Sequence, residues 1–478
     1  MTINRREHPL EPGADEMRAM LSEVSERIVA HVDSLGHQPA SYDEKSGRAA
    51  AQAFVEPLPQ DGADFSALLD RLFDDAVPQS FNTAGPGYLA YIPGGGLFPS
   101  AIADLIANAV NRYVGVFVAS PALVQLESNV IRWFCEIAGY PEGAGGILTS
   151  GGSLANFTAI VTARRERLPE AFHNGTLYTS DQTHHSVRKA AVLAGFPERN
   201  VVQIPSDDGF RIRVDVLEER IREDRAQGRT PFLIVGSAGT TNTGAVDDLT
   251  ALADLAEREE MWLHIDGAYG AFFVMTERGG IALKGLERAD SITLDPHKGL
   301  FLPYGTGALL VRDPDTLRRA HATFADYMPV MQHDADFVDF CDLSPELSRD
   351  FRGLRVWLPM KLFGIDAFRD ALDEKMDLAR WAAEEIRAMR GMEILAEPSL
   401  SLTAFRFAPE GMSAEDTNDL NRRILADVNA RQNVYMTGTM LGDRFALRIC
   451  VLSFRTHSDR MEQAIQDLRD AVESTAVR

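Results

Sequence analysis

Hydrophobic residues between positions 145 and 295 fall into short runs that recur roughly every thirty residues, the length of a β-α-β unit. The runs at 232–239, 262–268 and 291–295 are apolar throughout rather than alternating, as is typical of strands covered on both faces. Segments with helical spacing lie between the runs. We predict strands at residues 145–150, 176–180, 201–206, 232–239, 262–268 and 291–295. The pattern favours a doubly wound, mainly parallel α/β sheet.

The two ends of the chain have different patterns. Near the start, Met17, Leu21, Val24 and Ile28 form the apolar stripe of an amphipathic helix. Too little apolar sequence surrounds this helix to form a core, so we expect it to pack on another body or a second subunit. A long helix is predicted at 366–389.

Beyond that helix the pattern predicts a smaller α/β domain. Its expected elements are strands near 393–407, a helix at 413–430, strands at 433–437 and 444–454, and a helix at 458–475. We therefore expect an N-terminal helical segment (1–90), a large α/β domain (91–365) and a small C-terminal α/β domain (366–478).

Composition narrows the functional classes. The chain has 478 residues and a net charge of −22, which argues against nucleic-acid binding because phosphate attraction requires a basic face. Three scattered cysteines form neither a disulfide framework nor a CxxC metal site. The start lacks the apolar core of a signal peptide, and no run approaches the roughly 18 apolar residues of a membrane span. We expect a cytoplasmic protein without membrane contact.

Polar residues collect where the predicted strands end. Ligands of open parallel sheets bind at the carboxyl ends of the strands, so these residues are the candidates for a site. They are Ser150 to Ser153, Asp181 to His184, Gly239 to Thr241, Asp266, and Asp295 to Lys298. Each also has an ordinary structural explanation: a glycine-rich turn joins strand to helix, an aspartate caps a helix, and a lysine reaches from a strand end to solvent.

Together the four kinds of group point to one cofactor. An anion-binding turn, an imidazole, a buried carboxylate and the amine of Lys298 at one crevice suit pyridoxal 5′-phosphate, which needs an amine for its aldehyde and a carboxylate for its ring nitrogen. A metal hydrolase using His184, His185, His264, Asp266 and His297 is the rival class, but the sequence contains no HExxH or His-x-His pair. A non-catalytic scaffold protein has no need of an amine there.

Five segments resemble the group II pyridoxal-phosphate decarboxylases of fold type I, which include aromatic-L-amino-acid, glutamate and histidine decarboxylases. "TLDPHKGL" is similar to the N/D-P-H-K lysine motif, "LHIDGAYG" to H-x-D-A-A-Y-G, and "SDQTHHSVRKAA" to D-x-x-H-x-S. "AGTTNTGAVDD" and the upstream "GYLAYIPGG" segment also match, and the order and spacing of the motifs are kept over about residues 80–365.

The resemblance implies a role for each matching residue. Lys298 forms the internal aldimine, Asp266 pairs with the pyridinium N–H, and His184 stacks on the ring with Ala268 on the opposite face. The residues implied to border the phosphate or ring are Ser150, Gly151, Gly152, Thr241 and His297. Those implied to lie beside the substrate are Tyr91, Pro93 and Gly94.

The implied reaction is decarboxylation of an L-amino acid through the Lys298 aldimine and a quinonoid intermediate, in a homodimer. An aromatic substrate is favoured by Tyr91, Tyr113, Ile92 and Phe117. Another fold-type-I lyase or an aminotransferase is an alternative within the same fold.

Two departures from the family pattern matter. Asp295 stands where the aromatic enzymes have asparagine, and an acid near a phosphate is unfavourable unless it faces away. Phe340 stands where decarboxylases carry the tyrosine that protonates the α-carbon, although Tyr327 in the same loop is an alternative donor. Relatives with phenylalanine there are aldehyde synthases, so an oxidative, aldehyde-forming reaction is the alternative outcome.

Overall fold

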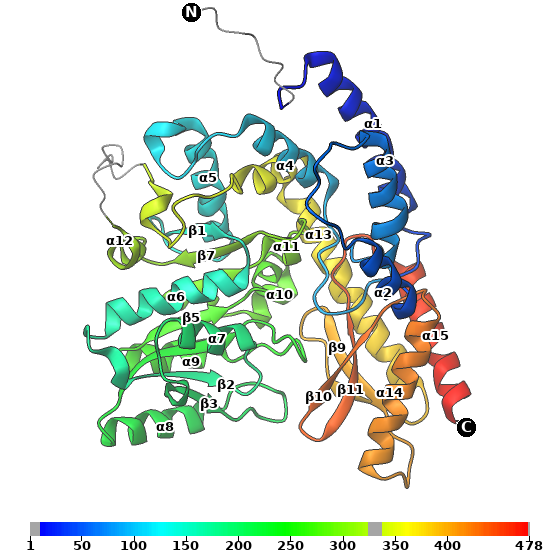
Figure 1. The fold of residues 1–478 in the computed structure, drawn as a ribbon. Coiled ribbons are helices and arrows are strands. Elements are labelled where there is room, and N and C mark those ends of the chain that lie inside the picture. The colour runs from blue at the N-terminus through cyan, green and yellow to red at the C-terminus, as the bar shows by residue number, and fades with distance from the viewer. Residues whose placement is uncertain (1–9, 324–336, 477–478) are drawn as a thin grey trace, which may run out of the picture.

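Two β-sheets organise the chain in the computed structural model, which describes residues 10–323 and 337–476 (Figure 1). The larger sheet has seven strands in the order β1-β7-β6-β5-β4-β2-β3. All neighbours are parallel except those of β7, which runs antiparallel to both β1 and β6. Its strands are β1 (Gly145–Thr149), β2 (Gly175–Ser180), β3 (Val201–Ile204), β4 (Thr230–Ser237), β5 (Trp262–Asp266), β6 (Ser291–Leu294) and β7 (Gly307–Val311).

Helices cover both faces of this sheet, which explains the three predicted strands at 232–239, 262–268 and 291–295 that are apolar throughout. Along β4, Leu233 and Val235 pack with helices α6 and α7, whereas Ile234 faces the side covered by α5, α8 and α9. The helices are α5 (Pro121–Ile137), α6 (Gly152–Arg167), α7 (His185–Leu193), α8 (Val214–Ala226) and α9 (Leu249–Arg258). The doubly wound, mainly parallel sheet that the sequence predicts is confirmed.

Strand β7 was not among the predicted strands. It returns from the segment after Lys298 and inserts between β1 and β6, with Gly307 opposite Thr149 and Ala308 opposite Leu294. A short apolar run gives no sign of strand direction, so only the tertiary structure reveals this antiparallel insertion.

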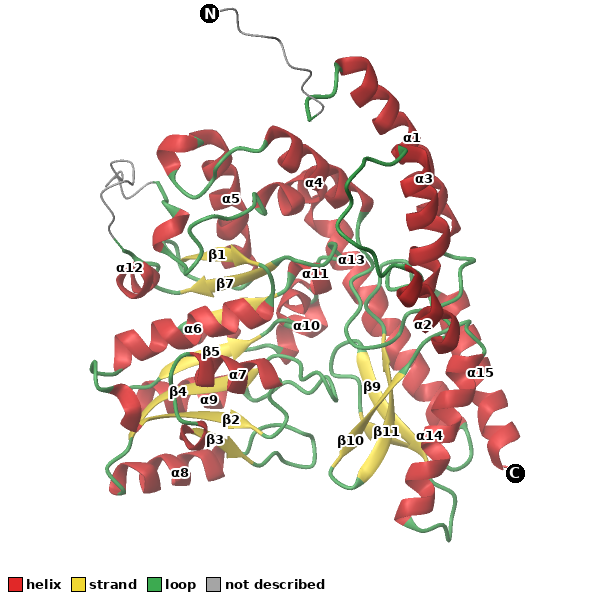
Figure 2. Cartoon of the chain, viewed as in Figure 1, coloured by secondary structure: helices red, strands yellow, loops and turns green. Residues whose placement is uncertain are grey.

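The smaller sheet is antiparallel and has the order β10-β11-β9-β8. Its strands are β8 (Met392–Ala396), β9 (Leu402–Phe407), β10 (Thr437–Leu441) and β11 (Arg444–Cys450). Helices α13 (Gly353–Ala388), α14 (Ala414–Ala430) and α15 (Ser458–Ala476) pack on it around Phe405, Leu447 and Ile449. Figure 2 shows this sheet and its helices beside the larger sheet.

One predicted strand is wrongly placed. The strand expected at 433–437 is β10, which begins only at Thr437, because the short turn at Gly442 and Asp443 sets Leu441 opposite Arg444. Tyr435 instead forms an isolated parallel bridge with Tyr88. The helix predicted at 366–389 is the part of α13 after Gly364, where the backbone leaves helical geometry (φ 74°).

The N-terminal helices lie along the small-sheet side of the molecule (Figure 1). The amphipathic helix predicted near the start is confirmed as α1 (Ala14–Ser34), none of whose residues is buried. Met17 and Leu21 of its apolar stripe are exposed. The other described α-helices are α2 (Glu44–Ala53), α3 (Phe65–Asp70), α4 (Phe98–Val110), α10 (Glu277–Ala282), α11 (Pro296–Gly299) and α12 (Asp315–His321).

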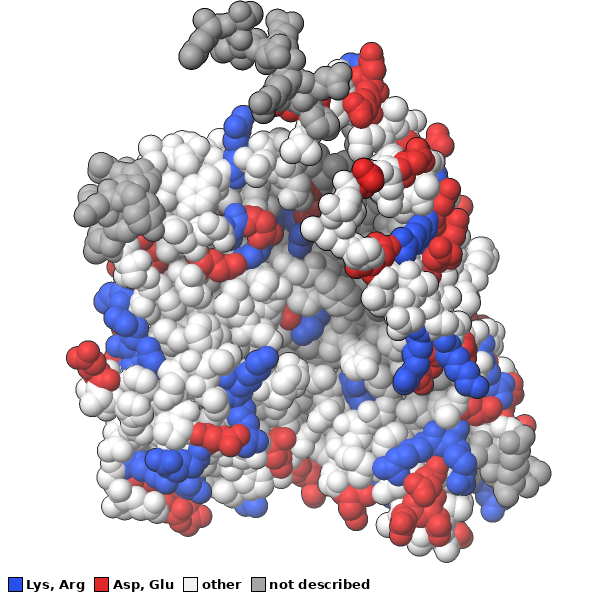
Figure 3. Space-filling view, in the orientation of Figure 1, with Lys and Arg blue, Asp and Glu red and all other residues white. Residues whose placement is uncertain are grey.

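Charged side chains of both signs are scattered over the face seen in Figure 3, and the surface is hollowed between the two sheet regions. Within residues 10–323 and 337–476, no helix is both long enough and apolar enough to cross a membrane. The three-part division of the chain at residues 90 and 365 stays a prediction.

Candidate active site

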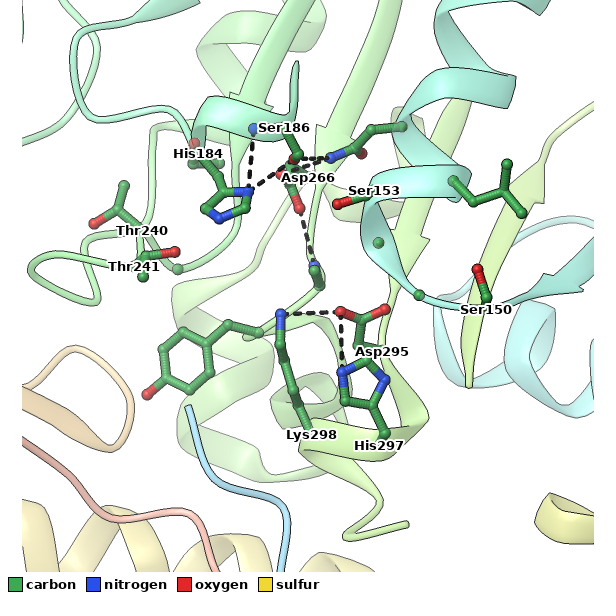
Figure 4. Close-up of a pocket in the computed structure, with 18 residues that line it drawn as sticks. Ser150, Ser153, His184, Ser186, Thr240, Thr241, Asp266, Asp295, His297 and Lys298 are labelled. Carbon is green, nitrogen blue, oxygen red and sulfur yellow. Dashed lines mark hydrogen bonds and ion pairs between the residues drawn. The ribbon is translucent and has the colours of Figure 1, made fainter. Parts of the chain in front are cut away.

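A cavity of about 290 Å³ opens at the carboxyl ends of the large-sheet strands. Figure 4 shows its lining, to which strands β1, β2, β5 and β6 each contribute the residues that follow them. The predicted cofactor-contacting residues all line it: Ser150, Gly151, Gly152, His184, Thr241, Asp266, Ala268, His297 and Lys298. The structure therefore brings together residues that the sequence spreads over about 150 positions.

Lys298 belongs to the short helix α11, which directly follows β6. Its Nζ lies 2.9 Å from Asp295 Oδ2, and its side chain is 23% exposed. Burial opposes the charged form, but the carboxylate of Asp295 outweighs it and raises the pKa of Lys298 above its ordinary value. Just after β6, the Lys298 amine thus points into the cavity and is held by its ion pair with Asp295 (Figure 4).

Asp266 ends β5 and is buried. Its Oδ2 accepts a hydrogen bond of 3.0 Å from Asn156 Nδ2, and its Oδ1 accepts one of 3.2 Å from the Ala268 backbone N–H. A buried carboxylate requires donors or a cation. Both donors here are neutral, and among the described residues no cation forms a hydrogen bond or ion pair with this carboxylate, which lines the cavity.

His184 precedes helix α7 and shares the Asn156 network. Its Nδ1 lies 2.8 Å from Ser186 Oγ, which in turn accepts a hydrogen bond of 3.0 Å from Asn156 Nδ2. Burial lowers the pKa of His184, while the charge of Asp266 acts in the opposite direction. Burial therefore favours the neutral form of the imidazole, and a neutral imidazole suits stacking on a cofactor ring better than a charged one does.

His264 lies beneath the cavity rather than in it. It is fully buried, with Nδ1 2.8 Å from Ser291 Oγ and Nε2 3.0 Å from Asn156 Oδ1. Burial lowers the pKa of His264 to about 4. It supports Asn156 and does not face Lys298, so it cannot join the other histidines around a common ion.

The turn from Ser150 to Ser153 leads into helix α6, which begins at Gly152, and can bind an anion. The first backbone N–H groups of a helix have no partner within the helix, and they carry partial positive charge. A Cβ atom added at Gly152 would lie 3.1 Å from Asp295 Oδ2 and 3.2 Å from Ala268 Cβ, so a side chain there would fill the cradle. A Cβ at Gly307 of β7 would lie 2.6 Å from Gly151 Cα. Small residues thus keep this end of the cavity open.

Residues on the opposite wall hold the backbone that borders the cavity. The Nδ1 atom of His297 lies 2.6 Å from the carbonyl oxygen of Thr306, to which it donates. Arg448 of β11 is buried, and its Nη2 and Nε donate to the carbonyl oxygens of Thr241 and Asn242. Among the described residues Arg448 forms no salt bridge with an acid. It fixes the turn that carries Thr241 from the small-sheet side.

These residues fit pyridoxal 5′-phosphate. The helix α6 turn can hold its phosphate, Asp266 can face its ring nitrogen, His184 and Ala268 border the space between them, and the Lys298 amine can reach its aldehyde carbon. Sequence reasoning missed Asn156, Ser186 as a donor to the His184 ring, and Arg448. One feature of the sequence could have pointed to Asn156: it is a lone amide in a helix segment whose other residues are mostly small or apolar.

Other predicted site residues do not line the cavity. Tyr91 is 55% exposed and has a left-handed backbone (φ 50°), and Gly94 packs directly against the backbone of His297. Pro93, between them, is buried. Phe340 is 2% exposed in an apolar cluster beneath the Arg349 guanidinium. Tyr327 lies outside the described residues.

The side chains proposed to suit an aromatic substrate are also away from the cavity. Ile92 belongs to the main core cluster, Phe117 stacks on Phe337, and Tyr113 donates to the carbonyl oxygen of Leu347. Their predicted role stays a prediction. In the described part of the chain, no group of three or more His, Cys, Asp or Glu side chains is arranged to hold a metal ion.

Known proteins match most of the chain. The model of the pyridoxal-dependent decarboxylase conserved domain matches residues 52–408. An aromatic-L-amino-acid decarboxylase of Bacillus atrophaeus is 34% identical, over 98% of both chains. An L-2,4-diaminobutyrate decarboxylase of Rhizobium meliloti is 31% identical over 88% of this chain and 84% of that relative. The crystal structure of Catharanthus roseus tryptophan decarboxylase in complex with L-tryptophan has a TM-score of 0.91 and 26% identity, covering 98% of this chain and all of that one.

Proposed function

The chain belongs to the family of pyridoxal-dependent decarboxylases, and we propose that it decarboxylates an aromatic L-amino acid. The enzyme is a carboxy-lyase that uses pyridoxal 5′-phosphate. The observation that carries the proposal is the meeting of the Lys298 amine, the Asp266 carboxylate and the neutral His184 imidazole in one cavity beside the helix α6 anion turn.

The cofactor supplies an aldehyde that condenses with amines and a conjugated ring that accepts the electrons of the broken bond. The protein supplies the rest. Lys298 would hold the cofactor through its amine, and the buried Asp266 carboxylate, fixed by Asn156 and the Ala268 N–H, would stabilise a proton on the ring nitrogen. His184, held by its contact with Ser186, would border the ring.

The substrate class is supported by two observations. The Bacillus atrophaeus relative and the Catharanthus roseus structure are named for aromatic substrates. Lys298 is also the sole Lys or Arg among the residues that line the described cavity. An acidic substrate side chain therefore finds no second cation there, which disfavours glutamate.

The test is a product assay over L-tryptophan, L-tyrosine, L-phenylalanine, L-glutamate and L-2,4-diaminobutyrate, run with and without added pyridoxal 5′-phosphate. We expect carbon dioxide and the arylalkylamine from at least one aromatic substrate, in amounts that depend on the cofactor. Turnover of diaminobutyrate or glutamate alone would overturn the aromatic assignment. Ammonia or peroxide in step with carbon dioxide would favour the aldehyde-forming alternative suggested by Phe340, whereas amine without ammonia would exclude it.

We further propose that the enzyme works as a cytoplasmic homodimer. Helix α4 exposes Ile102, Leu105 and Ile106, and helix α1 exposes Met17 and Leu21. Apolar surface of this kind is typical of association sites. A second copy covering these helices would also account for an N-terminal helix without buried residues. Light scattering of the purified chain tests this, and a monomer at micromolar concentration would contradict it.

A further inference from the structure

Asp295 occupies an unusual place for an acid. It lies between β6 and α11, its side chain is 3% exposed, and its Oδ2 lies 2.9 Å from Lys298 Nζ and 3.7 Å from His297 Nε2. Its Oδ1 is buried and has no hydrogen-bond partner among the described residues. The carboxylate also adjoins Gly152, at the anion-binding turn. The Asp295 carboxylate therefore faces the cavity. An acid beside a phosphate site is unfavourable unless it faces away, and Asp295 does not face away.

We propose that Asp295 is a positioning residue that keeps the Lys298 amine protonated and directed toward helix α6 in the cofactor-free enzyme, so that breaking this ion pair limits cofactor capture. The inference rests on the cofactor-binding role of Lys298 in the proposed function. It does not depend on which amino acid is the substrate.

The chemistry of capture gives the reason. Only a neutral amine can attack an aldehyde, so the Lys298 ammonium must first lose a proton to solvent, which its partly exposed side chain can contact. The nitrogen lone pair then forms a bond to the aldehyde carbon, and loss of one water molecule leaves a C=N bond. A carboxylate 2.9 Å from the ammonium opposes the first of these steps.

Other charged and titratable groups around Lys298 act less directly. Asp266 of β5 adds a second negative charge on the far side of the cavity. The Cys450 thiol of β11 acts on Lys298 from the small sheet. His184 and His297 would add positive charge only when protonated, and burial lowers the pKa of both. The Tyr304 phenol follows α11. Among the described residues, Asp295 is the acid that forms an ion pair with the Lys298 amine.

The test labels the cofactor-free enzyme with an amine reagent, trinitrobenzenesulfonate, across pH 6–11. The extent of labelling at Lys298 and at exposed Lys45 is read from the same sample by peptide mass spectrometry. We expect Asp295→Asn to move the midpoint of Lys298 labelling to lower pH and to raise its rate at pH 8 at least tenfold, a change of about one unit in its pKa. Asp315→Asn, at an exposed position on α12, should leave both unchanged.

A second measurement separates two ways in which Asp295 can act. Capture of pyridoxal 5′-phosphate and of pyridoxal is followed by the absorbance of the imine. If Asp295 acts through Lys298, Asp295→Asn speeds both captures by a similar factor. A gain for the phosphorylated aldehyde alone would show that the carboxylate repels the phosphate instead, and would overturn the proposal.

The unsubstituted enzyme provides a test even if Asp295→Asn does not fold. In its own titration, Lys298 should label with a midpoint above that of Lys45. A midpoint equal to or below that of Lys45 would overturn the proposal. Because no amino-acid substrate takes part, an inactive or differently specific enzyme would refute the proposed function without affecting this result.

Discussion

The Nδ2 atom of Asn156 lies 3.0 Å from Asp266 Oδ2, and the Asn156 amide links the Asp266 carboxylate to the His184 imidazole. The same Nδ2 donates to Ser186 Oγ, which contacts the His184 ring. Its Oδ1 accepts from Thr293 Oγ1 at 2.8 Å and from His264 Nε2 at 3.0 Å. All hydrogen-bonding positions of the amide are used, so its orientation is fixed.

Replacing Asn156 should weaken cofactor binding. In Asn156→Leu, Asp266 loses a buried donor, and a hydrogen bond to a charged group contributes about 1.5–3 kcal/mol. We therefore expect the Kd for pyridoxal 5′-phosphate, measured by absorbance titration, to rise about 10- to 100-fold. Asn421→Leu removes an equally buried amide from the small-sheet region. It should lower the unfolding free energy without changing the Kd, and an equal change in Kd for both variants would contradict the prediction.

Borohydride reduction of the loaded enzyme should place the pyridoxyl group on Lys298. Reduction converts the imine into a stable secondary amine, so the peptide that contains Lys298 should gain the mass of the label. Lys298→Ala should take up no label and lose activity. Mass spectrometry of the digest checks both outcomes, with Lys284→Ala, an exposed lysine, as the control. A label on another residue would contradict the assignment.

Asp266→Asn should leave the fold intact and reduce the rate. The amide has the same shape but cannot stabilise a proton on the ring nitrogen, so we expect kcat to fall by at least 10²–10³-fold, as for loss of one strong transition-state interaction. Asp181→Asn changes a carboxylate that follows strand β2, which β4 separates from β5. Asp181 accepts from the Ser206 backbone and does not line the cavity, so this variant should retain activity. Activity near the unsubstituted level in Asp266→Asn would exclude a proton-holding role.

Acid should destabilise the fold through His264. Its pKa is lowered to about 4 by burial, against about 6.5 in the unfolded chain. Between these values the unfolded state binds the additional proton, so stability falls as the pH decreases from 6.5 to 4. The contribution of this one group is at most about 3 kcal/mol. Urea unfolding at pH 7 and pH 4.5 measures it, and His264→Asn should lose less stability between the two pH values than the unsubstituted chain.

The sequence predicted the lysine, aspartate and histidine of the site because parallel strands bring their carboxyl ends together, whatever the details of packing. Asn156 escaped because its relation to Asp266 depends on how helix α6 is rotated against the sheet. Strand β7 and the true start of β10 escaped because short apolar runs do not reveal strand direction or turn position. The placement of Tyr91 and Phe340 outside the cavity depends on loop packing, which no periodicity encodes.

Strand β7 separates two of the strands whose ends line the cavity. It separates the strand that leads to the anion turn from the strand that leads to the lysine, and two inter-strand spacings together measure about 9.5 Å. A flat molecule with an anionic group at one end and a reactive carbon at the other can bridge that interval lengthwise. Strand β7 begins at Gly307, which lies opposite Thr149 of β1. A Cβ at Gly307 would lie 2.6 Å from Gly151 Cα, so a larger residue there would displace the turn that leads into α6 and distort the anion site without removing any group that lines the cavity.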